Sequence, residues 1–81
     1  MLNITLTEAG PSLCCGAVDD GATVSVVLAD GAVLEISRNL RDWNRIASTS
    51  GDVRVVTDDG KRAVMRFNLP TYPGHPVSVS V

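Results

Sequence analysis

Aromatic side chains are scarce in this sequence, whose 81 residues include only Trp43, Phe67 and Tyr72. Proteins that hold single-stranded nucleic acid stack successive bases on several aromatic rings. Such a stacking platform is missing here, because Trp43 and Phe67 are predicted to face the core and Tyr72 falls in a loop.

Metal-binding and redox-active residues are equally few. The sequence has two cysteines, Cys14 and Cys15, and one histidine, His75, whereas a structural zinc site takes four such ligands. Neighbouring Cα atoms lie about 3.8 Å apart, closer than a disulfide usually allows. We therefore predict no metal and no cofactor, and expect Cys14 to lie in the core and Cys15 to face outward. A reactive Cys15–His75 pair and an intermolecular disulfide are the alternatives.

Long apolar runs are also absent. No stretch approaches the roughly 18 apolar residues of a membrane span, and the first residues lack a basic segment followed by an apolar one. We therefore expect one soluble, cytoplasmic domain over residues 1–81. A domain of this length has little core to spare for a deep pocket. No acid, base and nucleophile converge in the pattern, so we do not expect an enzyme.

Basic residues are missing from the first 37 positions, which carry five acidic residues. Residues 38–81 hold all seven basic residues and four acidic ones, so the two parts have charges of −5 and +3. This asymmetry either marks a two-sided binding surface or is a chance result of a small sample.

Three Asp-Gly turns punctuate the chain, at residues 19–21, 29–31 and 58–60. Each lies between runs of alternating apolar residues, a pattern that predicts a β-hairpin. At 29–31 a three-residue loop, with Gly31 as a left-handed bulge, keeps the apolar side chains of both strands on one face. A two-residue loop would mix polar and apolar side chains there, so we predict three-residue loops.

The hairpin register also predicts which side chains meet. Val26 should face Leu34 on the core side, and Asp52 should face Arg66 on the outer side, where the two can form an ion pair. Segments 24–38 and 53–67 align at an offset of 29 residues. This weak repeat indicates either a duplicated hairpin or two hairpins built on the same pattern.

Between the hairpins, residues 39–51 carry apolar side chains at helical spacing after a potential N-cap, Asn39. The apolar face of this predicted helix consists of Leu40, Trp43, Ile46 and Ala47. The terminal segments 2–7 and 77–81 alternate as strands. The predicted fold is therefore α+β and β-rich: an antiparallel meander of about 6–7 short strands with one α-helix, in the order β-β-β-β-α-β-β-β. It is either open or barrel-like.

Two outward-facing features are candidates for binding a partner. One is a set of arginines on the helix and the second hairpin, and the other is the proline-rich loop at residues 69–76. Arginine and tyrosine are frequent binding hot spots. The predicted partner-binding residues are Arg41, Arg45, Arg62, Arg66, Tyr72 and His75.

These features favour a non-enzymatic protein-binding module, of the kind found in small bacterial or phage accessory proteins. It would inhibit or modulate a larger partner by surface occlusion, or serve as a subunit of an assembly. The partner is expected to carry an acidic patch. The alternative is a nucleic-acid-binding domain that uses the arginine face. The terminal strands 2–7 and 77–81 offer a route to a homodimer by edge pairing.

Overall fold

The computed structural model describes residues 2–57 and 59–81, which form nine short β-strands. In chain order these are β1 (Asn3–Leu6), β2 (Gly10–Pro11), β3 (Gly16–Val18), β4 (Thr23–Val26), β5 (Val33–Ser37), β6 (Asn44–Ala47), β7 (Gly51–Arg54), β8 (Ala63–Leu69) and β9 (Val77–Ser80). Asp58, which belongs to the third predicted turn, lies outside the described residues. Neither described range contains a helix that is long and apolar enough to cross a membrane.

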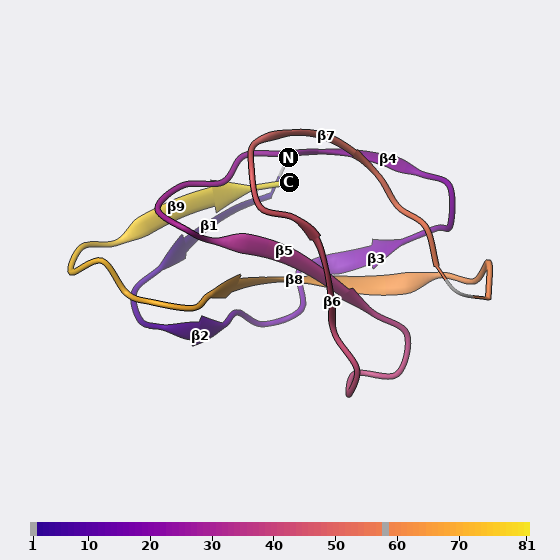
Figure 1. The fold of residues 1–81 in the computed structure, drawn as a ribbon, viewed down its shortest axis with the longest axis horizontal. Coiled ribbons are helices and arrows are strands. Elements are labelled where there is room, and N and C mark those ends of the chain that lie inside the picture. The colour runs from indigo at the N-terminus through magenta and orange to yellow at the C-terminus, as the bar shows by residue number, and fades with distance from the viewer. Residues whose placement is uncertain (1, 58) are drawn as a thin grey trace.

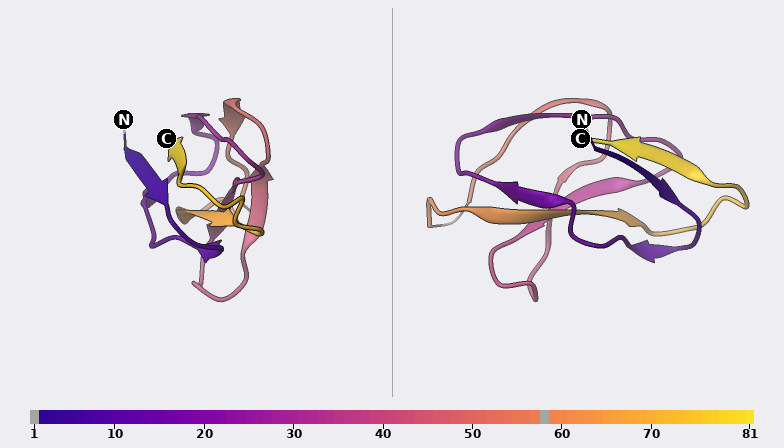
Figure 2. Two further views of the ribbon diagram at one scale, coloured as in Figure 1. Left: turned by 90° about the vertical axis from the view of Figure 1, so that its left-hand side faces the viewer. Right: turned by 180° about the vertical axis from the view of Figure 1, so that it is seen from behind.

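The strands pair in three antiparallel sheets (Figure 1). The largest has the order β2-β8-β5-β6, and β3 also pairs with β8. β4 pairs with β7, and β1 pairs with β9, which brings the two ends of the chain side by side (Figure 2). A bridge between Val27 and Ser80 joins the chain after β4 to β9. The result is a flattened molecule of 38 × 25 × 17 Å.

The predicted antiparallel, β-rich architecture is confirmed, but the meander is wrong. In a meander each strand pairs with the next, and among the described residues only β5 and β6 do so. β4 pairs with β7 instead of β5, and β3 pairs with β8 instead of β4. The predicted Asp52–Arg66 ion pair is wrong for the same reason, because Asp52 faces Ser25 in β4 and Arg66 faces Glu35 in β5.

The predicted edge strand at residues 77–81 is paired on both sides. β9 pairs with β1 along one side, and on the other Ser80 exchanges two backbone hydrogen bonds with Val27, of 2.9 and 3.0 Å. Of the two predicted edge strands, β1 alone keeps an open side among the described residues.

The second Asp-Gly turn forms with a shorter loop than predicted. Asp30 and Gly31 have φ angles of 53° and 85°, and the Ala32 N–H donates to the Ala29 carbonyl over 3.0 Å. Two left-handed central residues are typical of a type I′ turn, which has a two-residue loop. The predicted three-residue loop with a bulge at Gly31 is therefore wrong.

The 29-residue repeat reappears in the pairing of the strands. β4 and β7 occupy equivalent positions in the repeat, and Val24 lies opposite Val53, its own equivalent. β5 and β8 are also equivalent, and Ile36 lies opposite its equivalent, Met65. Antiparallel pairing of equivalent residues is the arrangement that a twofold axis produces. The two halves are therefore related by an approximate internal twofold.

The flanking strands β3 and β6 follow the same symmetry. Val18 of β3 lies opposite Ala63, and Ala47 of β6 lies opposite Leu34. The two pairs are equivalent, because Ala47 is 29 positions after Val18 and Ala63 is 29 positions after Leu34. Each half consists of three strands, β3–β4–β5 and β6–β7–β8. The halves interlock, because β4 and β5 find their partners in the other half instead of closing a hairpin on each other.

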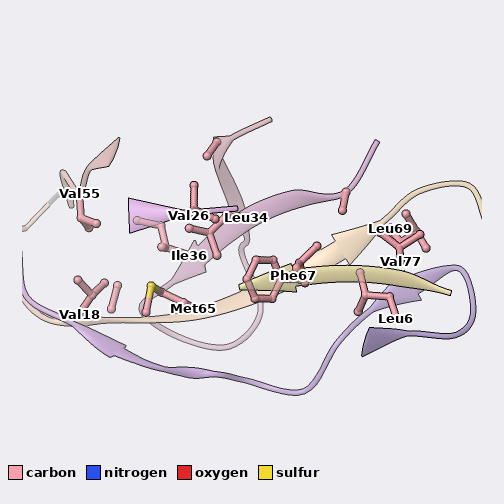
Figure 3. Packing of buried hydrophobic residues seen from close by; sticks show 14 residues of the cluster. Leu6, Val18, Val26, Leu34, Ile36, Val55, Met65, Phe67, Leu69 and Val77 are labelled. Atoms are coloured by element: carbon pink, nitrogen blue, oxygen red, sulfur yellow. The ribbon is translucent and has the colours of Figure 1, made fainter. Parts of the chain in front are cut away.

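The core lies where the two halves and the terminal strands meet. Most of the predicted inward face of the Asp30–Gly31 hairpin is buried, namely Val26, Leu34 and Ile36, whereas Val24 and Leu28 are only partly buried. Phe67 is fully buried and lies in the middle of the row of apolar side chains (Figure 3). Leu6 and Val77, from the terminal strands, close one end of this row. Burial of apolar surface in this row is the main source of stability.

The predicted helix at residues 39–51 is wrong. Residues 44–47 form β6 instead, in which Ala47 is buried and Ile46 packs against the core. Many residues of the segment favour the helix only weakly. They include Trp43, Asn44, Ser48, Thr49 and Ser50. The open side of β5 offers this segment backbone hydrogen bonds together with burial of its apolar side chains, and these outweigh the helical spacing.

Candidate protein-binding site

The chain between β5 and β6 forms a loop at residues 38–43 that protrudes from the sheets (Figure 1, Figure 2). We refer to it as the 38–43 loop. It contains Arg41, one of the predicted partner-binding residues, and its ends lie close to two others, Arg45 and Arg66.

Two polar side chains organise the 38–43 loop. The Ser37 hydroxyl accepts hydrogen bonds from the Leu40 and Asn39 N–H groups, over 2.9 and 3.3 Å. The Asn39 side-chain oxygen accepts from the Arg41 and Asp42 N–H groups, over 2.8 and 2.9 Å. Asn39 thus makes the bonds of an N-cap, although no helix follows. The loop is held in one shape by these bonds, which is the condition for binding at low entropic cost.

Leu40 is the unusual residue of this loop. Its φ angle is 65°, in a left-handed region that residues other than glycine and asparagine rarely adopt. Its side chain is 61% exposed. The equivalent residue of the second half, Leu69, lies in β8 and is fully buried. The two halves therefore differ at this position, because Leu40 is exposed to solvent whereas its equivalent, Leu69, is buried.

A partly buried cluster supports the loop at its base. The Arg66 Nε donates to the Glu35 carboxylate over 2.8 Å, and the side chains are only 20% and 13% exposed. The Arg66 guanidinium also lies over the Trp43 ring, 3.9 Å from its centroid. Trp43 was predicted to be a core residue, but it is only partly buried and covers this ion pair. The cluster fixes the end of the 38–43 loop against the outer face of β5 and β8.

The six predicted partner-binding residues do not form one surface. Arg41 lies in the 38–43 loop, and Arg45 is exposed in β6, opposite Glu35. Arg62 lies immediately before β8 and pairs with Asp19 over 2.9 Å, and Arg66 lies within β8 and pairs with Glu35. The other two lie beyond the opposite end of β8. There, Tyr72 packs against the core, and His75 lies 4.0 Å from Asp30.

Ion pairs within the molecule account for part of the asymmetric charge distribution of the sequence. Acidic residues from positions 1–37 meet basic residues from positions 38–81 in the pairs Asp19–Arg62 and Glu35–Arg66, whereas the pair Arg38–Asp59 lies within positions 38–81. The His75–Asp30 contact also joins the two parts of the sequence when the histidine is protonated. These two parts are electrostatically complementary, so the charge asymmetry does not by itself indicate a two-sided binding surface.

The orientation predicted for the two cysteines is reversed. Cys14 is exposed, whereas Cys15 is partly buried against the core and its thiol lies 3.5 Å from the Met65 carbonyl oxygen. The alternation of β3 does not continue past Gly16, whose φ angle of 146° lies outside the range of ordinary strands. Both cysteines are free thiols.

Thiol labelling of the native protein should therefore modify Cys14 before Cys15. Burial raises the pKa of the Cys15 thiol, so the reactive thiolate is scarcer there, and access is restricted. The rates can be followed by peptide mass spectrometry at pH 7, with urea-unfolded protein as the control in which the difference should shrink. Faster labelling of Cys15 in the native state would contradict this arrangement.

The described residues contain no group of three or more His, Cys, Asp or Glu side chains placed to hold a metal ion. Comparisons with protein-family models, with curated proteins and with solved structures found no match. The 38–43 loop is the best candidate site, because it combines exposure, a fixed shape and an exposed apolar side chain. The sequence did not predict that Leu40 is exposed. The available signal was the dipeptide "NL", which occurs at residues 39–40 and again 29 positions later at residues 68–69.

Proposed function

We propose that this chain is a non-enzymatic protein-binding module that contacts its partner through the 38–43 loop. The observation that supports this is Leu40, an apolar side chain exposed on a strained backbone. A non-glycine residue in the left-handed region costs on the order of 1 kcal/mol or more, and such strain concentrates at functional sites. An exposed leucine in a loop held by side-chain hydrogen bonds is suited to fill an apolar pocket of a partner.

The charged neighbours of Leu40 suggest the chemistry of the partner. Arg41 lies in the loop and Arg45 follows it in β6, and neither forms an ion pair with another described residue. They favour a partner with an acidic patch around an apolar pocket, because complementary charges speed association. Arg62 and Arg66 are already paired with carboxylates, which a phosphate would have to displace. The ion pairs therefore favour a protein partner over a nucleic acid.

Within this proposal, the chain acts as a small accessory protein of bacterial or phage type. It inhibits or modulates a larger partner by occlusion, or joins an assembly. A cytoplasmic location is part of the same proposal.

Replacing Leu40 with asparagine should abolish partner binding while leaving the fold intact. Asparagine tolerates the left-handed backbone, so the free energy of unfolding should stay within about 0.5 kcal/mol or rise slightly. Affinity capture from a lysate of the source cells, quantified by mass spectrometry, compares the variant with the unsubstituted protein. The matched control is Leu13→Asn, at a leucine that is 90% exposed but lies outside the loop. A folded Leu40→Asn variant that captures the same proteins as the control would refute the proposed function.

A further inference from the structure

A groove opens beside the 38–43 loop, between β6, the end of β5 and the chain that follows β7. Its volume is about 280 Å³. Ile36 and Ile46 contribute apolar side chains to its lining, while Val56 and Thr57 lie along one wall. Residues of the 38–43 loop, among them Arg38 and Asp42, complete the lining.

The internal twofold relates this groove to a part of the molecule that is already filled. Val56 is the equivalent of Val27, 29 positions earlier. The Val27 N–H donates to the Ser80 carbonyl over 2.9 Å, and the Ser80 N–H donates back over 3.0 Å. β9 is thus joined to the first half at Val27 by a single antiparallel bridge, and its Val77 and Val79 side chains are buried in the core.

The second half lacks such a bridge among the described residues. On either side of Val56, the N–H groups of Val55 and Thr57 donate to Ala22 and Asp20 of the first half, each over 2.8 Å. Because backbone groups alternate in direction along an extended chain, the N–H and carbonyl of Val56 point away from the first half. They make no hydrogen bond with another described residue. Its side chain is 71% exposed. Val56 presents one open donor and one open acceptor at the position where Val27 binds β9.

We propose that this groove accepts an extended strand of the partner protein, which pairs with the Val56 backbone as β9 pairs with Val27. The proposal rests on the proposed function and specifies how the partner binds. Strand addition at an open edge takes its affinity from main-chain hydrogen bonds and its specificity from alternate side chains. The occupant is therefore a segment with β-branched residues at alternate positions, as in the "VSVSV" of residues 77–81.

The positive charge of Arg41 favours a bound segment that carries an acidic residue next to its alternating β-branched residues. Arg41 belongs to the loop that forms one wall of the groove and makes no ion pair with another described residue. Arg41 is not among the lining residues of the groove, so it would meet a carboxylate that lies beyond the alternating residues, outside the groove. The basic residue of the lining, Arg38, already pairs with Asp59. An acidic flank also agrees with the acidic patch that the proposed function assigns to the partner.

Amide hydrogen exchange followed by NMR tests the proposal on the unsubstituted protein. The probe is the capped hexapeptide EVSVSV, and KVSVSV is its charge-reversed control. At a concentration about ten times its Kd, EVSVSV should slow exchange of the Val56 amide about tenfold. The Val27 amide, already bonded to Ser80, should not change. KVSVSV should bind more weakly.

Three results would overturn the proposal. Exchange at Val56 that is unchanged at about 1 mM EVSVSV, a concentration that reveals even weak binding, would show that the groove takes no strand. Faster exchange at Val27 would show that the peptide displaces β9 instead. Equal binding of both peptides would refute the acidic flank.

Variants of Val56 separate this proposal from the function on which it rests. Val56→Pro removes the open N–H and should abolish partner capture, whereas Val56→Thr keeps both the N–H and β-branching and should retain it. If Val56→Pro fails to fold, the exchange experiment still decides the question. Loss of capture with Leu40→Asn but not with Val56→Pro would refute the groove and keep the loop, and unchanged capture with both would refute both proposals.

Discussion

Replacement of Phe67 by alanine is expected to remove a large part of the free energy of unfolding of this protein. Phe67 is fully buried in the middle of the apolar row, where side chains of both halves and of the terminal strands meet (Figure 3). Truncation of a buried phenylalanine costs about 3–5 kcal/mol, through lost burial and the cavity left behind. A domain of this length has a total stability of about 4–12 kcal/mol, so the loss removes much of its margin. Urea unfolding followed by circular dichroism and Trp43 fluorescence measures the change.

Val64 in the same strand provides the matched control. It points to the other face of β8 and is only partly buried, so Val64→Ala should cost well under half as much as Phe67→Ala. Phe67→Leu, which keeps most of the volume, should fall between the two. Equal losses for Phe67→Ala and Val64→Ala would mean that Phe67 is not the centre of the core.

Two-residue alternation predicted many of the inward-facing side chains, although not the orientation of Cys14 and Cys15, and it did not predict which strand lies beside which. Val26 and Leu34 are both buried, as predicted, yet they belong to strands that are not paired. Alternation reports the face of a strand and is unchanged when that strand takes a different neighbour. The Asp-Gly signal likewise predicts only that the chain reverses. At Asp30–Gly31 the turn forms, but the strands on either side of it, β4 and β5, do not pair with each other.

The interlocked pairing has a physical reason that the local pattern does not contain. A separate two-stranded hairpin leaves its apolar face uncovered and is marginal in water. When β4 pairs with β7 and β5 with β8, the apolar faces of the two halves cover each other. The repeat at residues 24–38 and 53–67 was the available signal, but a repeat is compatible both with two separate hairpins and with one interlocked pair.

The candidate site was the least predictable part. Leu40 was assigned to the core because its spacing matches a helix, and the left-handed backbone that exposes it depends on the Ser37 and Asn39 side chains. The prediction that Asn39 caps a helix is wrong, although its side-chain oxygen accepts the hydrogen bonds of a cap, because these bonds do not determine whether a helix follows. The predicted arginines do not form one outward-facing set, because Arg62 and Arg66 pair with Asp19 and Glu35.

Arg66→Ala is expected to destabilise the protein by about 2 kcal/mol, although Arg66 was predicted to be a partner contact. The substitution removes a partly buried ion pair with Glu35 and the contact with the Trp43 ring. It leaves the Glu35 carboxylate, 13% exposed, without its guanidinium. Breaking a fully buried pair costs about 3–5 kcal/mol and an exposed one about 0–1, so an intermediate loss is expected. Cation–π contacts add about 0.5–1 kcal/mol.

A double-mutant cycle with Glu35→Ala isolates the pair, and Arg62→Ala serves as its control. The Arg62–Asp19 pair has a similar Nε–Oδ1 distance of 2.9 Å, but its side chains are 67% and 70% exposed. Its removal should change the free energy of unfolding by less than about 0.5 kcal/mol. The Glu35–Arg66 coupling should exceed about 1 kcal/mol, so the double variant loses less than the sum of the single ones. Equal effects of Arg66→Ala and Arg62→Ala would show that the cluster beneath the 38–43 loop does not stabilise the fold, and would return Arg66 to the surface residues available to a partner.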